Sequence, residues 1–322
     1  MKRFICAVIS VFLILSCIAG CETDKNGESK INIVTTIFPQ YDWTREILGE
    51  KLNDVNLTLL LDSGVDLHSY QPTAKDIVTV SSSDLFIYVG GESDEWVEEI
   101  LEESTNKDMK KIALMDYDNL LIEETVEGMQ ETEEDDEDED EEETEYDEHI
   151  WLSLKKAQTF CKVIAKTLGE IDSKNADYYT ENADKYIEKL DALDKEYESV
   201  VGNSTQKTLI FADRFPFRYL TNDYGLNYFA AFKGCSAESE ASFETISFLS
   251  NKVKETGVPC VIALEGSDGK IAKTVISTAN DPALFVATLD SMQSITLKDV
   301  NSGKTYLDIA KSNLDSLEKA LT

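Results

Sequence analysis

Short runs of β-branched and apolar residues alternate with stretches of helical spacing through the first half of the chain. Residues 31–38 (INIVTTIF) have the composition of a buried strand, which Pro39 ends. Strands that alternate with helices predict a mostly parallel sheet with helices on its faces, an α/β arrangement. The expected strands are residues 31–38, 55–61, 85–89 and 111–115, and the expected helices are residues 41–52, 76–83 and 95–103.

The second half repeats this alternation after one long helical stretch. Residues 175–201 are rich in helix formers, with apolar or aromatic residues at steps of three and four. A chain of 322 residues also exceeds what one core usually serves. We therefore expect two α/β lobes, residues 31–170 and 204–322, joined by a linking helix in residues 171–203. The later expected strands are 207–211, 227–231, 260–264 and 284–289, and the later helices are 154–168, 215–223, 243–256, 270–278 and 305–321.

The N-terminal segment has the pattern of an export signal. A positive start, Met1-Lys2-Arg3, precedes the apolar residues 4–18. Small residues then lead to Cys21, and this junction resembles the bacterial lipobox, in which the cysteine is lipidated and becomes the new N-terminus. The pattern predicts a signal peptide over residues 1–20, a diacylglyceryl anchor on Cys21 and a polar tether over residues 21–30. The alternative is an uncleaved anchor helix, for which the apolar run is short.

An acidic run interrupts the first lobe. Residues 131–148 carry 15 of the chain's acidic side chains, and the formal net charge is −33. Because like charges repel and no apolar surface is available, the run cannot fold alone, and we expect a disordered loop over about residues 123–148. The charge argues against nucleic acid and anionic lipid as partners and allows cations. The loop is either a solvated spacer or a segment that collects cations beside a metal site.

The cysteines indicate no zinc–thiolate cluster. Beyond the signal and Cys21, the chain has Cys161, Cys235 and Cys260, an odd number without C-x-x-C spacing. An exported chain can hold a disulfide, and the pair to consider is Cys235–Cys260.

The two histidines of the chain, His68 and His149, occupy similar positions. Both lie in expected strand-to-helix loops of the first lobe, where α/β folds bind ligands, and each has carboxylates beside it. Nitrogen and carboxylate donors together suit zinc or manganese. A lone histidine is more often a core or surface residue than a ligand. It is therefore the presence of two similarly placed histidines that indicates a metal site. The neighbouring carboxylates are Asp62 and Asp66 near the first histidine, and Asp147 and Glu148 at the second.

Two motifs around these histidines resemble those of the metal-binding lipoproteins of ABC importers for zinc and manganese, the TroA-like family. The first is GVDLHSYQPT in residues 64–73, and the second is DEHIWL in residues 147–152. The resemblance runs from about residue 31 to the C-terminus. It implies a monomeric, non-enzymatic protein on the outer face of the membrane, which holds Zn²⁺ or Mn²⁺ between two lobes and delivers it to the importer's permease.

The resemblance also implies two ligands from the second lobe. One is Asp290, which lies in a matching Leu-Asp-Ser segment. The other is a histidine or glutamate in relatives, but its register here falls on Arg214, a fixed cation that cannot coordinate metal. Asp213 is the nearest donor, unless it only forms a salt bridge with Arg214. Glu238 and Glu240 are the alternatives.

Other functions remain open at this level. A secreted metallohydrolase needs an open coordination position, but the chain has no His-Glu-x-x-His or Gly-x-Ser-x-Gly motif. An acidic metal-buffering or cell-adhesion protein would bind metal only through the acidic run. The expected ligands, two nitrogens and two oxygens, are closer to a manganese site, whereas the position of the acidic loop and the general affinity order favour zinc. Either metal should be lost below about pH 5 to 6, as the histidines protonate.

Overall fold

The computed structural model describes residues 30–102, 104–117, 119–130, 145–236 and 240–322. The expected signal peptide and Cys21, residues 131–144 of the acidic run and Glu238 lie outside the described residues. The chain divides into two units, Met1–Ile31 and Asn32–Thr322, and both lobes belong to the second.

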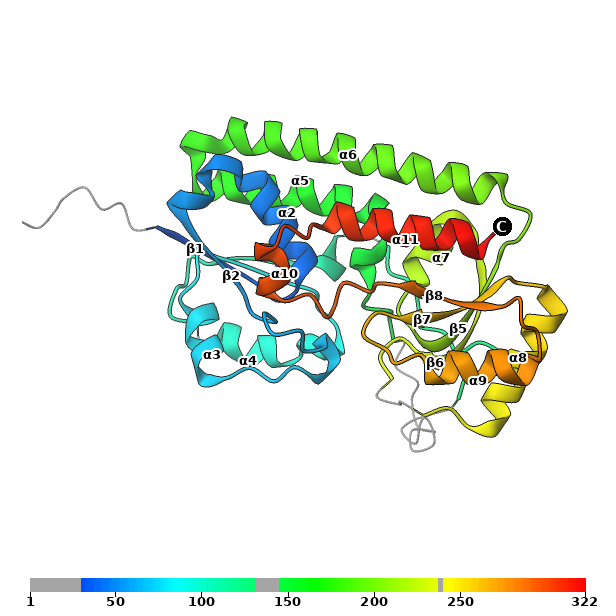
Figure 1. The fold of residues 1–322 in the computed structure, drawn as a ribbon. Coiled ribbons are helices and arrows are strands. Elements are labelled where there is room, and N and C mark those ends of the chain that lie inside the picture. Colours follow the sequence, from blue (N-terminus) through cyan, green and yellow to red (C-terminus); the bar gives the residue numbers. More distant parts are fainter. Residues whose placement is uncertain (1–29, 103, 118, 131–144, 237–239) are drawn as a thin grey trace, which may run out of the picture. The chain divides into compact units, whose positions relative to one another are not determined.

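The first lobe is built on a four-stranded sheet of order β2-β1-β3-β4. The central strand β3 pairs in parallel with β1 and with β4. Figure 1 shows α2 on one face of this sheet and α3 and α4 on the other. The strands are β1 (Ile31–Thr35), β2 (Val55–Leu59), β3 (Leu85–Tyr88) and β4 (Lys110–Ala113), and the helices are α2 (Phe38–Leu48), α3 (Ala74–Ser81) and α4 (Trp96–Glu102).

The second lobe repeats the plan with a sheet of order β6-β5-β7-β8. Strand β5 pairs in parallel with β6 and β7, and β7 pairs in parallel with β8. Helices α8 and α9 cover one face of this sheet (Figure 1). The strands are β5 (Thr208–Phe215), β6 (Asn227–Lys233), β7 (Cys260–Leu264) and β8 (Phe285–Leu289), and the helices are α7 (Arg218–Tyr224), α8 (Phe243–Thr256), α9 (Lys270–Ala279), α10 (Leu297–Asn301) and α11 (Tyr306–Ala320).

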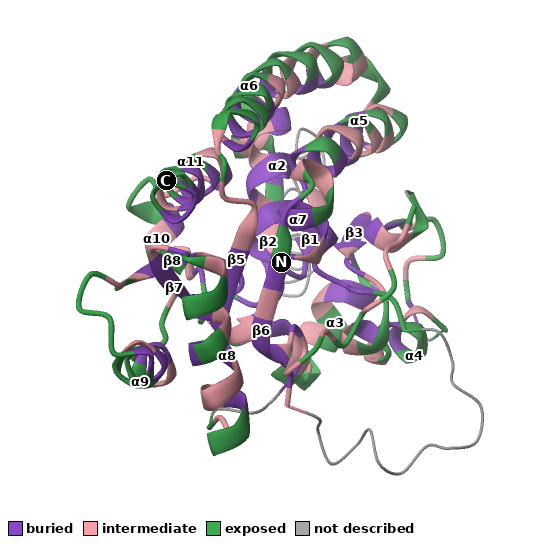
Figure 2. Ribbon diagram, turned by 90° about the vertical axis from the view of Figure 1, so that its right-hand side faces the viewer, coloured by how far each residue is buried: buried purple, intermediate pink, exposed green. Residues whose placement is uncertain are grey.

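Helix α6 (Ala176–Asn203) runs along both lobes, packed on α5 (Leu154–Ile171), α2 and α11. Its buried stripe contains the residues expected from the helical spacing, and its outer side is exposed (Figure 2). Near its start, the Asn182 side chain donates to the carbonyl of Ile47 in the first lobe. Near its end, the Tyr197 hydroxyl donates to the carbonyl of Ala310 in the second lobe. The predicted α/β fold of two lobes joined by one long helix is confirmed.

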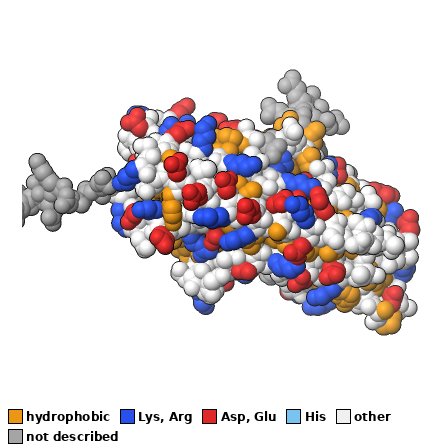
Figure 3. Space-filling model, turned by 90° about the horizontal axis from the view of Figure 1, so that it is seen from above, with side chains coloured by type: hydrophobic (Ala, Val, Ile, Leu, Met, Phe, Trp, Pro, Cys, Tyr) orange, Lys and Arg blue, Asp and Glu red, His pale blue; other side chains and the backbone are white. Residues whose placement is uncertain are grey.

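The surface over α6 carries acidic and basic side chains side by side (Figure 3). Ion pairs connect Lys195 with Asp191 along the helix, and Lys311 of α11 with Glu196. All four side chains are exposed, so these pairs contribute little to stability. This face is therefore mixed in charge, in contrast to the acidic run. Among the described residues, no helix combines the length and apolar character of a membrane span.

Four details differ from expectation. The loop expected to be disordered over about residues 123–148 is ordered at both ends, where the Glu123 N–H donates to the Glu145 carbonyl and the Gln130 N–H donates to the Ala231 carbonyl. Helix α2 begins at Phe38, before Pro39, because proline fits the first turn of a helix, where its missing N–H has no partner to lose. Strand β5 continues to Phe215 instead of ending at Phe211, through a register shift against β6. The disulfide considered between Cys235 and Cys260 is wrong, since both cysteines are free.

Candidate metal centre

His68 is placed by a tight turn between β2 and α3. The turn, Leu67–Ser69, is a single 3₁₀ helix whose N-cap is Asp66. The Asp66 Oδ1 atom accepts a hydrogen bond from the His68 backbone N–H at 3.1 Å, which satisfies a donor that the turn leaves free. Leu67 is fully buried and anchors the turn to the core. The local sequence thus fixes the backbone that carries the imidazole.

His149 is held more rigidly and is completely buried. Its backbone N–H donates to Asp147 Oδ1 at 2.9 Å, and its Nδ1 lies 3.2 Å from the same oxygen. The next residues form a buried 3₁₀ turn, Ile150–Leu152. Within this turn, the indole N–H of Trp151 donates to the Ser291 carbonyl of the second lobe at 2.9 Å. This second motif therefore also connects the lobes.

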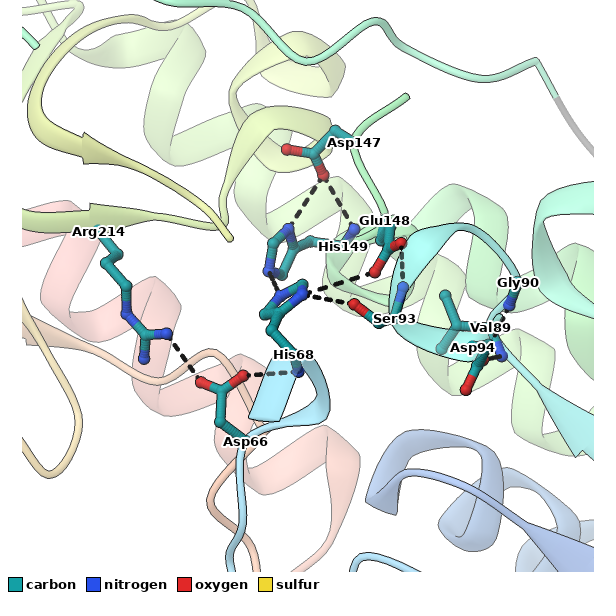
Figure 4. Close-up of polar contacts among 10 residues, drawn as sticks. All are labelled: Asp66, His68, Val89, Gly90, Ser93, Asp94, Asp147, Glu148, His149 and Arg214. Carbon is teal, nitrogen blue, oxygen red and sulfur yellow. Dashed lines mark hydrogen bonds and ion pairs between the residues drawn. The ribbon is translucent and has the colours of Figure 1, made fainter. Parts of the chain in front are cut away.

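The two imidazoles face each other. Their Nε2 atoms are 3.1 Å apart, as Figure 4 shows. The Nδ1 of His68 lies 2.6 Å from the Ser93 hydroxyl and 3.6 Å from a Glu148 carboxylate oxygen. With Nδ1 of each ring partnered, both Nε2 atoms remain directed at a common point. Two nitrogens bound to one tetrahedral zinc lie about 3.3 Å apart, so the pair already has near-ligating geometry.

The imidazoles differ in their electrostatic surroundings. Burial and the neighbouring His149 lower the pKa of His68 to about 3. Burial alone would lower the pKa of His149 as well, but the carboxylates of Asp147, Glu148 and Glu123 outweigh it and raise that pKa above its usual value. Protonation is therefore favoured on His149 and disfavoured on His68. A metal ion that binds the His149 ring displaces any proton held on its ligating nitrogen.

Cys235 is the third member of this group, and sequence reasoning missed it. His68, His149 and Cys235 each offer one ligand atom, and these atoms all lie within 4.8 Å of one another. The cysteine follows β6 in a tight turn, beside Gly234. A Cβ on Gly234 would lie 2.8 Å from the His149 ring, so only glycine allows this close approach.

The surroundings of Cys235 keep its sulfur protonated. Burial and then the nearby carboxylates of Glu123 and Glu148 raise the thiol pKa far above its usual value. A thiolate would form here only when a cation offsets this negative field. The available sequence signal was the odd number of cysteines, which leaves at least one of them without a disulfide partner.

The two aspartates expected as ligands are not members of this group. Asp213 lies within β5, where its Oδ2 accepts from the Leu264 N–H of β7 at 3.2 Å. Asp290 follows β8, where its Oδ1 accepts from the Met292 N–H at 2.8 Å and its Oδ2 lies 3.7 Å from Lys304 Nζ. Both carboxylates have partners of their own, and their roles as ligands stay predictions.

Arg214 does not form the salt bridge considered with Asp213. Its Nη1 lies 2.9 Å from Asp66 Oδ2, on the turn that carries His68 (Figure 4), so the expected pairing is wrong. Because β5 is longer than expected, Arg214 belongs to the strand and its side chain reaches across to the first lobe. Asp66, Arg214, Asp213 and the exposed Glu240 line a cavity of about 850 Å³ between the lobes.

The donor set is suited to zinc. Two imidazoles and a thiol are the nitrogen and sulfur donors that zinc takes in proteins, whereas manganese favours oxygen. The three side chains converge although they are far apart in sequence. This arrangement fits capture of a single ion.

Comparison with known proteins agrees with this description. Residues 33–320 match the model of a protein family described as the zinc-uptake complex component A, periplasmic (ZnuA). The high-affinity zinc uptake system protein ZnuA of Bacillus subtilis is 32% identical over 318 residues, which are 98% of this chain and 96% of that protein. The zinc-binding lipoprotein AdcA of Streptococcus pneumoniae is 29% identical over 97% of this chain, but only 60% of AdcA is covered.

Solved structures give the same result. The crystal structure of the Zn(II)-bound ZnuA-like domain of Streptococcus pneumoniae AdcA superimposes with a TM-score of 0.73 at 28% identity, covering 91% of this chain and 99% of that domain. The chain thus spans little more than half the length of the streptococcal relatives, and that part corresponds to one domain of AdcA.

Proposed function

The chain belongs to the zinc-uptake complex component A (ZnuA) family, and from this we propose that it captures Zn²⁺ outside the cell and delivers it to the permease of an ABC importer. The observation that carries the proposal is the convergence of His68 and His149, with Nε2 atoms 3.1 Å apart, beside Cys235. Such a centre binds and releases an ion and catalyses no reaction.

We assign the first contacts with the ion to the Nε2 atoms of His68 and His149. Both rings are oriented by their Nδ1 partners, which lowers the entropy lost on binding. The thiolate of Cys235 is the proposed ligand from the second lobe. Asp290 and Asp213 remain proposed further ligands, each of which would have to leave its present hydrogen-bond partner.

The same donors support zinc as the metal. A thiolate is a soft ligand and stabilises zinc far more than manganese, which prefers carboxylate, carbonyl and water oxygens. The expected ligand set of two nitrogens and two oxygens would discriminate less. Cys235 is therefore the side chain on which selectivity for zinc depends in this proposal.

The place of action is proposed from the N-terminal sequence and from a relative. The lipobox-like junction at Cys21 suits a lipid anchor, and the S. pneumoniae relative is a lipoprotein by name. We propose a monomer tethered to the outer face of the membrane through Cys21. The permease would then be within reach of the tethered protein.

Native mass spectrometry of the full-length chain in mild detergent tests the proposal. Zn²⁺ and Mn²⁺ are offered separately and then together, to the unaltered protein and to His68→Ala. We expect one tightly held Zn²⁺, retained in the presence of Mn²⁺ and lost in the variant. Several weakly held ions that are unaffected by the substitution would instead indicate an acidic metal buffer.

A further inference from the structure

The Asp66 carboxylate connects the two lobes at the metal centre. Its Oδ1 accepts from the backbone N–H of His68 at 3.1 Å, and its Oδ2 lies 2.9 Å from Nη1 of Arg214. One short side chain thus contacts both a proposed ligand of the first lobe and a strand of the second lobe (Figure 4). Any movement of the His68 turn away from the second lobe has to break the contact with Arg214.

Arg214 is anchored on a rigid part of the second lobe. Strand β5 lies inside its sheet, with β6 on one side and β7 on the other. Arg214 is in register with Phe232 of β6, and the preceding residue, Asp213, bonds to the backbone of Leu264 in β7. The Arg214 backbone is therefore paired with β6, and the Asp213 side chain beside it ties the strand to β7.

The loop before the His68 turn is also attached to the second lobe. The Leu297 N–H donates to the Asp62 carbonyl at 3.1 Å, and Ser63 forms an antiparallel bridge with Thr296. Gly64 follows with a φ of +77°, and a Cβ there would lie 3.0 Å from a backbone oxygen of the second lobe. These contacts involve residues 62–64, which precede the turn that carries His68. The Asp66–Arg214 pair joins the N-cap of that turn to the second lobe.

We propose that Arg214 is a positioning residue that sets the rate at which the metal ion leaves, by holding the His68 turn against the second lobe through Asp66. This inference rests on the proposed function, because it takes His68 as a ligand. The side chains of Arg214 and Asp66 are 28% and 22% exposed, so solvent screens the pair only in part.

The position also explains how an arginine is compatible with a cation site. A fixed positive charge near a divalent ion is repulsive, but Asp66 lies against this one and neutralises it. Arg214 in turn occupies one oxygen of Asp66, while the His68 backbone occupies the other. Asp66 is thereby held as a structural group, although it is a carboxylate two residues from a proposed ligand.

The test is the dissociation rate of Zn²⁺ from the full-length protein, measured by stopped flow against an excess of a chromophoric chelator. The variants are Arg214→Met, Asp66→Asn and the two combined. Asparagine keeps the oxygen that caps the His68 turn and removes the charge. Arg218→Met is the matched control, since Arg218 pairs with Glu124 at the same 2.9 Å and is 21% exposed, but contacts no proposed ligand.

We expect zinc to leave about tenfold faster from each single variant than from the unaltered protein, and no faster from the double variant than from either single variant. Arg218→Met should lower the melting temperature about as much as Arg214→Met does. It should leave the dissociation rate of zinc unchanged. If Arg214→Met still bound zinc but released it at an unchanged or slower rate, the proposed role of Arg214 would be wrong. The proposed function would not be affected by that result. If the unaltered protein bound no zinc, the proposed function would fail together with the role of Arg214.

Discussion

The two lobes supply donors of different character to the candidate metal centre. In the first lobe, His68 and His149 have Nδ1 partners that orient their Nε2 atoms toward each other. In the second lobe, Cys235 sits in a turn as a protonated thiol, because burial and carboxylates oppose its ionisation. The first lobe is thus organised before an ion arrives, whereas the second lobe's donor becomes competent when the ion is present. We infer that capture starts at the histidines and is completed by the thiol.

The largest expected effect is the loss of an oriented histidine. His149→Ala should weaken zinc binding about a thousandfold, since the binding energy of structural zinc is shared among few ligands. Chelator competition measures the affinity. Deleting residues 131–144 is the contrasting variant and should alter the rate of capture but retain the tight site. If the deletion abolished binding and His149→Ala did not, the acidic run would be the metal site.

Replacing the donor from the second lobe should have a smaller effect on affinity and a larger one on selectivity. Cys235→Ser should weaken zinc binding about a hundredfold and bring the affinities for Zn²⁺ and Mn²⁺ closer together, because a hydroxyl is a harder and weaker donor. Competition between the two metals measures this. Cys260→Ala, which removes a buried free thiol in β7, should change neither affinity. An unaltered preference in Cys235→Ser would exclude the thiol as ligand.

The number of protons released when zinc binds should differ between the donors of the two lobes. At pH 7.5, Cys235 should release one proton per zinc, because its raised pKa keeps the thiol protonated until the ion binds, and the raised pKa of His149 should add to this release. His68, with a pKa of about 3, should add none. Affinity should therefore rise with pH, and below the His149 pKa each further unit of acidification should cost about an additional tenfold.

Calorimetry in buffers of different ionisation enthalpy measures this release. Cys235→Ser should release one proton fewer than the unaltered protein. Equal release from both would show that the thiol keeps its proton in the complex.

The smallest effect is expected at the hydrogen bond that links the second motif to the second lobe. Trp151→Phe removes the indole donor from the buried Ser291 carbonyl and should destabilise the fold by about 2 kcal/mol. Urea unfolding measures this loss. Zinc affinity should change less than threefold, since the bond fixes the lobes and touches no donor. A large loss of affinity without loss of stability would make Trp151 part of the metal centre.

The sequence predicted those features that depend on local patterning. The alternation of strands and helices, the linking helix and both histidine loops follow from periodicity and from short motifs. The length of β5 did not follow, because the register shift between Phe211 and Arg214 depends on pairing with β6. The longer strand contains both Asp213 and Arg214, and the Arg214 side chain contacts Asp66 of the first lobe. Cys235 carried no motif, since its role arises only where a turn of the second lobe meets two loops of the first.

X-ray absorption spectroscopy at the zinc edge identifies the atoms bound to the ion and so tests the His-His-Cys centre itself. We expect one sulfur at about 2.3 Å together with two imidazole nitrogens at about 2.0 Å in the zinc-loaded protein. The sulfur contribution should disappear in Cys235→Ser while the imidazole signal remains. A spectrum from the unaltered protein with only nitrogen and oxygen ligands would contradict the His-His-Cys centre.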